Sequence, residues 1–178
     1  MYVRDFKTED IKLALQTFIP SPAMTPGRMN MFHFKNYTVM LDYAHNTHGI
    51  QAIGKFVHAV DAPIKVGIVA AVGDRRNEDI IALGEESAKI FDEIIIRQDK
   101  NLRGRTEEDL IALMTQGIYN IDPNKKVNIF RKEAEAIDFA MANAQKDSFI
   151  VVISDVVPDA LEQVKRYKDI EDGVELSA

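Results

Sequence analysis

An aspartate, two histidines and an asparagine follow one another within DYAHNTHG, residues 42–49. The stretch comes directly after an apolar run, residues 39–41, and directly before an amphipathic stretch, which is typical of a strand that gives way to a helix. Helix N-terminal amides favour an anion, and an aspartate at a strand end can bind ribose hydroxyls. The stretch therefore predicts a ligand site. The alternative is a structural role, in which Asp42 accepts hydrogen bonds from loop amides.

Two arginine-containing stretches follow later apolar runs. VGDRRNE occupies residues 72–78, and RQDKNLRGR occupies residues 97–105. An arginine pair beside a helix start can bind a phosphate or carboxylate bidentately, and nine mostly polar residues exceed what a strand-to-helix connection requires. Both stretches are candidate substrate loops. The alternative in each case is a solvated turn whose charges pair with one another.

The three-residue spacing of Asp42, His45 and His48 is compatible with metal ligands. A catalytic zinc site, however, usually has a third strong ligand and a helix that holds its histidines. The chain contains no cysteine, which excludes thiolate sites and disulfides. We therefore predict no metal site made by this chain alone.

Short apolar, β-branched runs provide the elements that must position these loops. Each run is long enough for a buried strand and too short for a helix. They are residues 39–41, 66–70, 94–96, 127–130 and 149–153, with helical periods between them. A hairpin over residues 32–39 adds an antiparallel strand. The pattern predicts an α/β fold with a Rossmann-like, doubly wound, mostly parallel sheet of about six strands, in which the loops share the ligand-binding edge.

The first 25 residues differ from the rest of the chain. A helical stretch begins at Thr8 and is followed by the proline-rich segment PSPA, residues 20–23. A lone helix with a stiff linker is what the tail of a preceding domain would look like. We therefore predict a division into residues 1–25, the tail and linker of a preceding domain, and residues 26–178, a separate domain.

The composition narrows the possible partners. The net charge of −6 argues against a surface that neutralises many phosphates, so we predict no nucleic-acid partner. The apolar runs are far shorter than a membrane helix requires, and the N-terminal residues lack the pattern of a signal peptide. We predict a cytoplasmic protein without a membrane partner.

The located motifs together resemble those of the C-terminal domain of the Mur ligase family, in particular its cyanophycin synthetase branch. The segments that carry the resemblance are TPGRMN (25–30), LDYAHN (41–46), GDRR (73–76), LRGR (102–105) and EAEAI (133–137). The chain differs from the family pattern at Thr47 and His48, and its loop before LRGR is less acidic.

The resemblance implies an ATP-dependent ligase in which an amine attacks an acyl phosphate. A central domain would hold the P-loop and most Mg²⁺ ligands, while the C-terminal domain closes over the nucleotide and presents the amine. ATP-binding residues would be Arg28, Asp42, His45 and Asn46. Substrate-binding residues would be Asp74, Arg75, Arg76, Asp99, Arg103 and Arg105. No catalytic residue is expected within these 178 residues, which should be inactive alone.

The implied substrates are arginine and a poly-aspartate chain, joined through the arginine α-amine and an aspartate β-carboxylate. The partners would be the rest of the same polypeptide and further copies in a homo-oligomer. Two other hypotheses remain at this point. One is a free-standing Rossmann-type module that senses a nucleotide or amino acid, and the weaker one is a receiver-like domain with Asp42 as phosphoacceptor.

Overall fold

The secondary structure alternates strands and helices as the sequence predicts. The computed structural model describes residues 7–17, 21–44, 46–98 and 102–174. Within them the strands are β1 (Asn30–His33), β2 (Tyr37–Asp42), β3 (Lys65–Val69), β4 (Glu93–Arg97), β5 (Lys126–Phe130) and β6 (Ser148–Ile153). The helices are α1 (Thr8–Thr17), α2 (Thr47–Ala59), α3 (Asn77–Ile90), α4 (Glu107–Ile121), α5 (Glu133–Ala142) and α6 (Val157–Glu171).

The described strands form one sheet in the order β1-β2-β6-β3-β4-β5. β1 pairs antiparallel with β2, and the other neighbouring pairs are parallel. Every residue of β6 is buried, because strands flank both of its edges and helices cover both of its faces. The predicted mostly parallel, doubly wound sheet with one antiparallel strand is confirmed.

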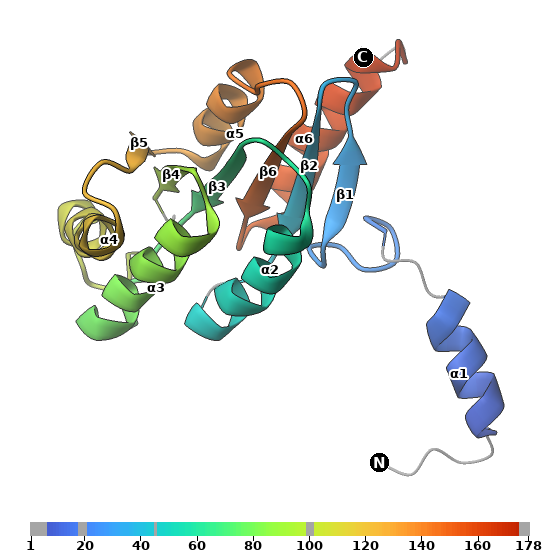
Figure 1. Ribbon diagram of the computed structural model, residues 1–178, viewed down its shortest axis with the longest axis horizontal. Coiled ribbons are helices and arrows are strands. Elements are labelled where there is room, and N and C mark those ends of the chain that lie inside the picture. Colours follow the sequence, from blue (N-terminus) through green and yellow to red (C-terminus); the bar gives the residue numbers. More distant parts are fainter. Residues whose placement is uncertain (1–6, 18–20, 45, 99–101, 175–178) are drawn as a thin grey trace.

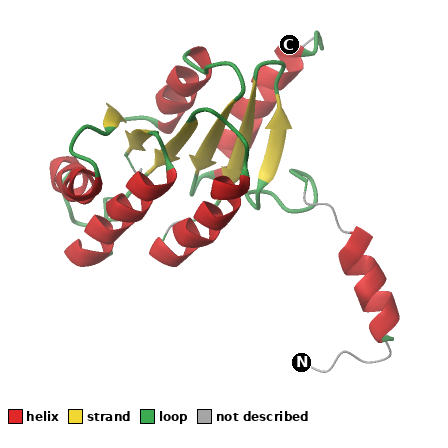
Figure 2. Ribbon diagram, viewed as in Figure 1, coloured by secondary structure: helices red, strands yellow, loops and turns green. Residues whose placement is uncertain are grey.

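Helices cover the two faces of the sheet as separate layers (Figures 1 and 2). α2, α3 and α4 pack on one face around side chains such as Met40, Ile50 and Met114. α5 and α6 pack on the other face around Ile137 and Val164. These side chains are at most 1% exposed, and burying each one stabilises the fold by about 1.5–3 kcal/mol.

Glycines let α3 and α4 approach each other at backbone distance. A Cβ atom at Gly84 would lie 2.4 Å from the carbonyl oxygen of Met114, and one at Gly117 would lie 2.0 Å from that of Ile81. No side chain fits at such distances, so both positions require glycine. The close contact sets the position of α4 relative to α3, and so it also constrains the loop that leads into α4.

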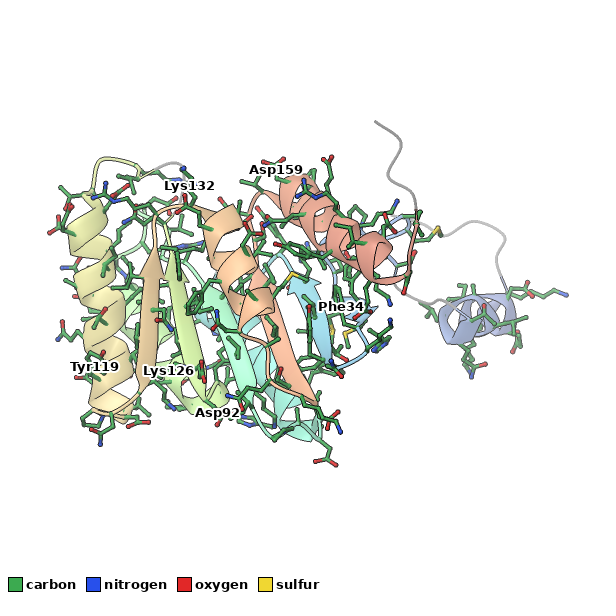
Figure 3. The ribbon with its side chains drawn as sticks, turned by 90° about the horizontal axis from the view of Figure 1, so that it is seen from above. Phe34, Asp92, Tyr119, Lys126, Lys132 and Asp159 are labelled. Atoms are coloured by element: carbon green, nitrogen blue, oxygen red, sulfur yellow. The ribbon has the colours of Figure 1, made fainter. Side chains whose placement is uncertain are left out.

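The parallel strands direct their carboxyl ends to one edge of the sheet. In Figure 3 Lys132 and Asp159, which follow β5 and β6, lie at that edge, while Asp92 and Lys126 lie at the opposite edge. The candidate ligand loops after β2, β3 and β4 therefore meet on the Lys132 side.

α1 lies apart from the sheet and its covering helices in Figure 1 and buries no residue. Its apolar side chains Leu13 and Leu15 are 61% and 70% exposed. The division of the chain at residue 25 stays a prediction. Among the described residues, no helix is both long and apolar enough to cross a membrane.

Glu171 of α6 binds the turn of the β1–β2 hairpin. Its carboxylate accepts the Lys35 amide at 3.0 Å and the Lys168 ammonium group at 3.0 Å. The Lys35 amide, with Lys168 as a smaller contributor, holds the pKa of Glu171 below its ordinary value. This contribution to stability is present above the ordinary carboxyl pKa and is lost as the pH falls through the lowered one.

Glu171→Gln is therefore expected to lower the melting temperature at neutral pH but to have little effect in acid. The check is thermal unfolding of both proteins between neutral pH and about pH 3. A difference in melting temperature that does not change with pH would contradict the assignment of this stabilisation to the ionised carboxylate.

Candidate functional site at the carboxyl edge of the sheet

Asn30 organises the loop of residues 25–30, which leads into β1. Its side chain is fully buried; Oδ1 accepts the Gly27 amide at 2.7 Å and Nδ2 donates to the Thr25 carbonyl at 3.0 Å. Gly27 has a left-handed φ of 72°, and a Cβ atom there would lie 2.6 Å from a Val157 methyl group. The sequence motif contained Asn30, but its spacing gave no sign that the side chain shapes the loop.

Asn30→Asp is expected to lower the free energy of unfolding by about 1–3 kcal/mol, because an ionised carboxylate cannot donate to the Thr25 carbonyl. Urea unfolding at neutral pH measures the loss. Asn36→Asp in the exposed hairpin turn is the matched control and should change stability little. Equal losses of unfolding free energy in the two variants would show that the buried Asn30 hydrogen bonds do not stabilise the fold.

Asp42 connects this loop to the end of β2. Its Oδ2 accepts the Met29 amide at 2.9 Å, and its Oδ1 accepts the Ala44 amide at 2.9 Å. The side chain is buried among these donors. Both oxygens therefore have a structural role, as the alternative interpretation proposed, and nucleotide binding by Asp42 stays a prediction.

A cavity of about 330 Å³ opens between this loop and the start of α2. Arg28, Tyr43 and Asn46 contribute to its wall, and the Arg28 guanidinium carbon lies 5.5 Å from the centre of the Tyr43 ring. No carboxylate among the described residues forms an ion pair with Arg28. The Asn46 side chain caps α2 by accepting the Gly49 amide at 2.8 Å. His45 lies outside the described residues.

The GDRR turn after β3 contains two arginines with different surroundings. Arg76 pairs with Asp79 through two hydrogen bonds of 3.0 and 2.9 Å on the surface. The Asp79 carboxylate raises the pKa of Arg76, and Arg76 lowers the pKa of Asp79. The Arg75 guanidinium lies 4.0 Å from Asp74, which also pairs with Arg103. The two arginines of GDRR therefore do not form one clamp.

Arg75 contributes instead to a second cavity, of about 320 Å³, beside the start of α2. Asn46, Thr47 and His48 form the α2 side of this cavity. Because Asn46 lines both cavities, the Arg28 cavity and the Arg75 cavity both reach the N-terminus of α2. α2 has no acidic residue in its first turn, so its N-terminal amides and these arginines favour anionic ligand groups.

The LRGR loop packs directly on the GDRR turn. A Cβ atom at Gly73 would lie 2.0 Å from the carbonyl oxygen of Leu102. The guanidinium group of Arg105 donates three hydrogen bonds to the turn and the start of α3, and Arg103 pairs with Asp74. The structure thus brings five of the six predicted substrate residues into one unit, and the sixth, Asp99, lies outside the described residues.

Comparison with known proteins decides the family. The model of the Mur ligase, glutamate ligase domain matches residues 27–156. The chain belongs to the Mur ligase C-terminal domain family. It is 36% identical over 164 residues to the cyanophycin synthetase of Trichormus variabilis, which covers 92% of this chain but only 18% of that protein. The cyanophycin synthetase of Synechocystis sp. is 34% identical over 169 residues, 95% of this chain and 19% of its own length.

More distant ligases share the fold of this Mur ligase domain. Escherichia coli FolC in complex with DHPP and ADP superposes with a TM-score of 0.69 at 18% identity, over 93% of this chain and 36% of that one. A UDP-N-acetylmuramoyl-L-alanyl-D-glutamate–2,6-diaminopimelate ligase gives a TM-score of 0.64 at 20% identity, over 83% and 29%. These matches support the mixed six-stranded sheet.

A buried ion cluster in this Mur ligase domain was not predicted from the sequence. Arg97, at the end of β4, is 4% exposed and contacts Glu133 at 2.8 Å and Asp155 at 2.5 Å. It also donates to the Ile153 carbonyl, while Glu133 accepts the Ser154 hydroxyl at 2.9 Å. The cluster joins the carboxyl ends of β4 and β6 to the start of α5. The only local signal was a charged residue directly after the apolar run 94–96.

No metal centre is formed by the described residues: they contain no group of three or more histidine, cysteine or acidic side chains placed to hold an ion. The basic and amide groups of the two cavities are suited to a nucleotide or a carboxylate.

Proposed function

We propose that this chain is the C-terminal domain of a cyanophycin synthetase-type ligase, which binds ATP and presents arginine for joining to the β-carboxylate of aspartate in a poly-aspartate chain. One observation carries the proposal: a cavity with Arg28 and a cavity with Arg75 share Asn46 at the same helix N-terminus. The similarity to cyanophycin synthetases over 92% of the chain supports the choice of reaction.

The cavity beside Arg28 is suited to part of a nucleotide. An arginine without an acidic partner among the described residues, an aromatic ring and a capped helix N-terminus provide positive charge and a flat apolar surface. ATP would be held by Arg28 and Asn46, with His45 nearby and Asp42 shaping the wall through its loop bonds. When bound, ATP supplies the phosphoryl group that activates a carboxylate. Mg²⁺ would be held mainly by the central domain.

The GDRR–LRGR unit would select and orient the amino acid. Arg75 is placed to bind a carboxylate group of the incoming amino acid, because its side chain lines the second cavity. Asp74, Arg76, Arg103 and Arg105 support that loop unit through their ion pairs and hydrogen bonds. Asp99 would meet the positively charged end of the substrate. Holding the amine beside the activated carboxylate can supply about 7–11 kcal/mol of the barrier.

The remaining parts of the proposal concern the longer protein. Residues 1–25 would connect to a central domain that carries the catalytic groups, and the natural-length protein would be a cytoplasmic homo-oligomer. The isolated 178 residues would then bind ligands without turning them over.

The test is ADP release by the natural-length enzyme with an aspartate-chain primer, comparing arginine, lysine and ornithine. Release that depends on arginine supports the proposed reaction. Release that depends on lysine or ornithine instead would retain the ligase and change its substrate. A folded protein that binds ATP but releases no ADP with any of the three amino acids would favour the binding-module hypothesis.

A further inference from the structure

The side chain of Arg105 is engaged with the protein itself. Nε donates to the Gly73 carbonyl at 3.0 Å, one terminal nitrogen donates to the Arg75 carbonyl at 2.8 Å, and the other donates to Asn77 Oδ1 at 2.7 Å. Two of the acceptors belong to the turn between β3 and α3, and the third, Asn77, is the first residue of α3; all are far from Arg105 in the sequence. One guanidinium group therefore contacts this turn and the start of α3 at three points.

Among the residues that the structure describes, few other polar contacts hold the turn in place. Asp74 pairs with Arg103, but both side chains are almost half exposed, so solvent screens the pair. The turn's own backbone bond, from the Arg75 amide to the Val72 carbonyl, is 3.2 Å long. The close contact of Gly73 with Leu102 prevents the loops from approaching further but does not hold them together. Arg105 is thus the main polar contact across the two loops.

The chemistry of this contact requires an arginine. A guanidinium group presents donors in a fixed planar fork, so it can bond to three acceptors in different directions at once. A lysine ammonium group is a compact charge and does not reproduce this geometry. Losing the side chain would leave the Gly73 and Arg75 carbonyls without these donors.

The position of Arg105 separates it from the proposed ligand groups. Among the described residues that line the two cavities, Arg75 is present and Arg105 is not. Because Arg105 bonds to the main-chain carbonyl of Arg75, it fixes the backbone from which the Arg75 side chain extends toward the cavity.

We propose that Arg105 is a positioning residue for amino-acid binding: it holds the GDRR turn so that Arg75 faces the cavity beside α2, and it does not touch the substrate. This inference rests on the proposed function for its kinetic consequence. Its structural part, the attachment of one loop to the other, can be tested without turnover.

The first experiment compares Arg105→Met with the unchanged natural-length enzyme. We expect the KM for the amino acid to rise about 10- to 100-fold, because small displacements of a substrate-orienting group have effects of that size. The KM for ATP should stay nearly constant, since the Arg28 cavity does not involve this turn. Hydrogen exchange of the amides in residues 73–77 should accelerate. Arg131→Met is the matched control, because Arg131 is 77% exposed and lines neither cavity.

A second variant separates positioning from direct binding. Asn77 contacts the Arg105 guanidinium, so Asn77→Ala should also raise the amino-acid KM, and the double variant should be less impaired than the product of the two single effects. If Arg105→Met raises the KM while Asn77→Ala and the exchange rates show no change, Arg105 is a substrate ligand and the inference is wrong. An unchanged amino-acid KM in Arg105→Met also overturns it.

The absence of amino-acid-dependent turnover in the unchanged enzyme would be a failure of the proposed function. In that case the exchange measurement alone decides the inference. Faster exchange over residues 73–77 in Arg105→Met, and not in Arg131→Met, would support the attachment of the two loops, and unchanged exchange would refute it.

Discussion

Replacing Arg97 by methionine is expected to lower the free energy of unfolding by about 3–5 kcal/mol, the usual cost of removing one partner of a buried ion pair. Arg97 is 4% exposed, and Glu133 is 13% exposed, so little water can compensate for the lost contact. The substitution leaves Glu133 and Asp155 close together without the cation between them. Urea unfolding at neutral pH measures the loss.

Arg131→Met provides the control for Arg97→Met. Arg131 is 77% exposed, and its guanidinium lies 3.7 Å from Glu107, so we expect a change of no more than about 1 kcal/mol. Adding Glu133→Gln to Arg97→Met should recover part of the stability, because it removes one of the stranded charges. If Arg97→Met lowered the free energy of unfolding by less than Arg131→Met does, the buried cluster would not stabilise the fold.

Gly117→Ala is expected to destabilise the protein by about 1–3 kcal/mol, the range for adding atoms to a packed core. In an exposed helix the same change would stabilise by about 1 kcal/mol, since alanine is the better helix former. The sign reverses here because the new methyl group would lie 2.0 Å from the Ile81 carbonyl oxygen. Thermal and urea unfolding both report the change.

A substitution at an exposed position of α4 separates the effect of helix propensity from the effect of core packing. Ala112→Gly lies on the solvent face of α4 and should cost about 0.5–1 kcal/mol from backbone entropy alone. If alanine proved the more stable residue at both positions 112 and 117, the close approach of α3 and α4 would be without energetic consequence.

Local patterns were sufficient to predict most of the fold. The continuous run at residues 149–153 indicated a strand buried on both faces, and β6 is such a strand. The hairpin expected over residues 32–39 is present as the antiparallel pair of β1 and β2. Such signals lie within a few residues of one another, so the sequence displays them directly.

The candidate site was predictable in its location but not in its bonding. The loops after β2, β3 and β4 were identified from polar residues at strand ends, and the structure places them at one edge. The partners of Arg97 and Arg105 were not predictable, because their acceptors are distant in the sequence and meet only through the strand order. For Asp42, the spacing allowed both a ligand role and a structural role, and the hydrogen bonds to Met29 and Ala44 document the structural one.

The contact between Gly73 and the Leu102 carbonyl has a consequence for engineering substrate specificity. Because the two loops meet at backbone distance and share the Arg105 bonds, neither loop has an independent shape. A chimera that receives only one of them from a relative with another amino-acid preference would combine mismatched surfaces. Transplanting residues 72–77 together with residues 102–106 preserves the match, so under the proposed function the pair is the unit in which amino-acid specificity would be exchanged.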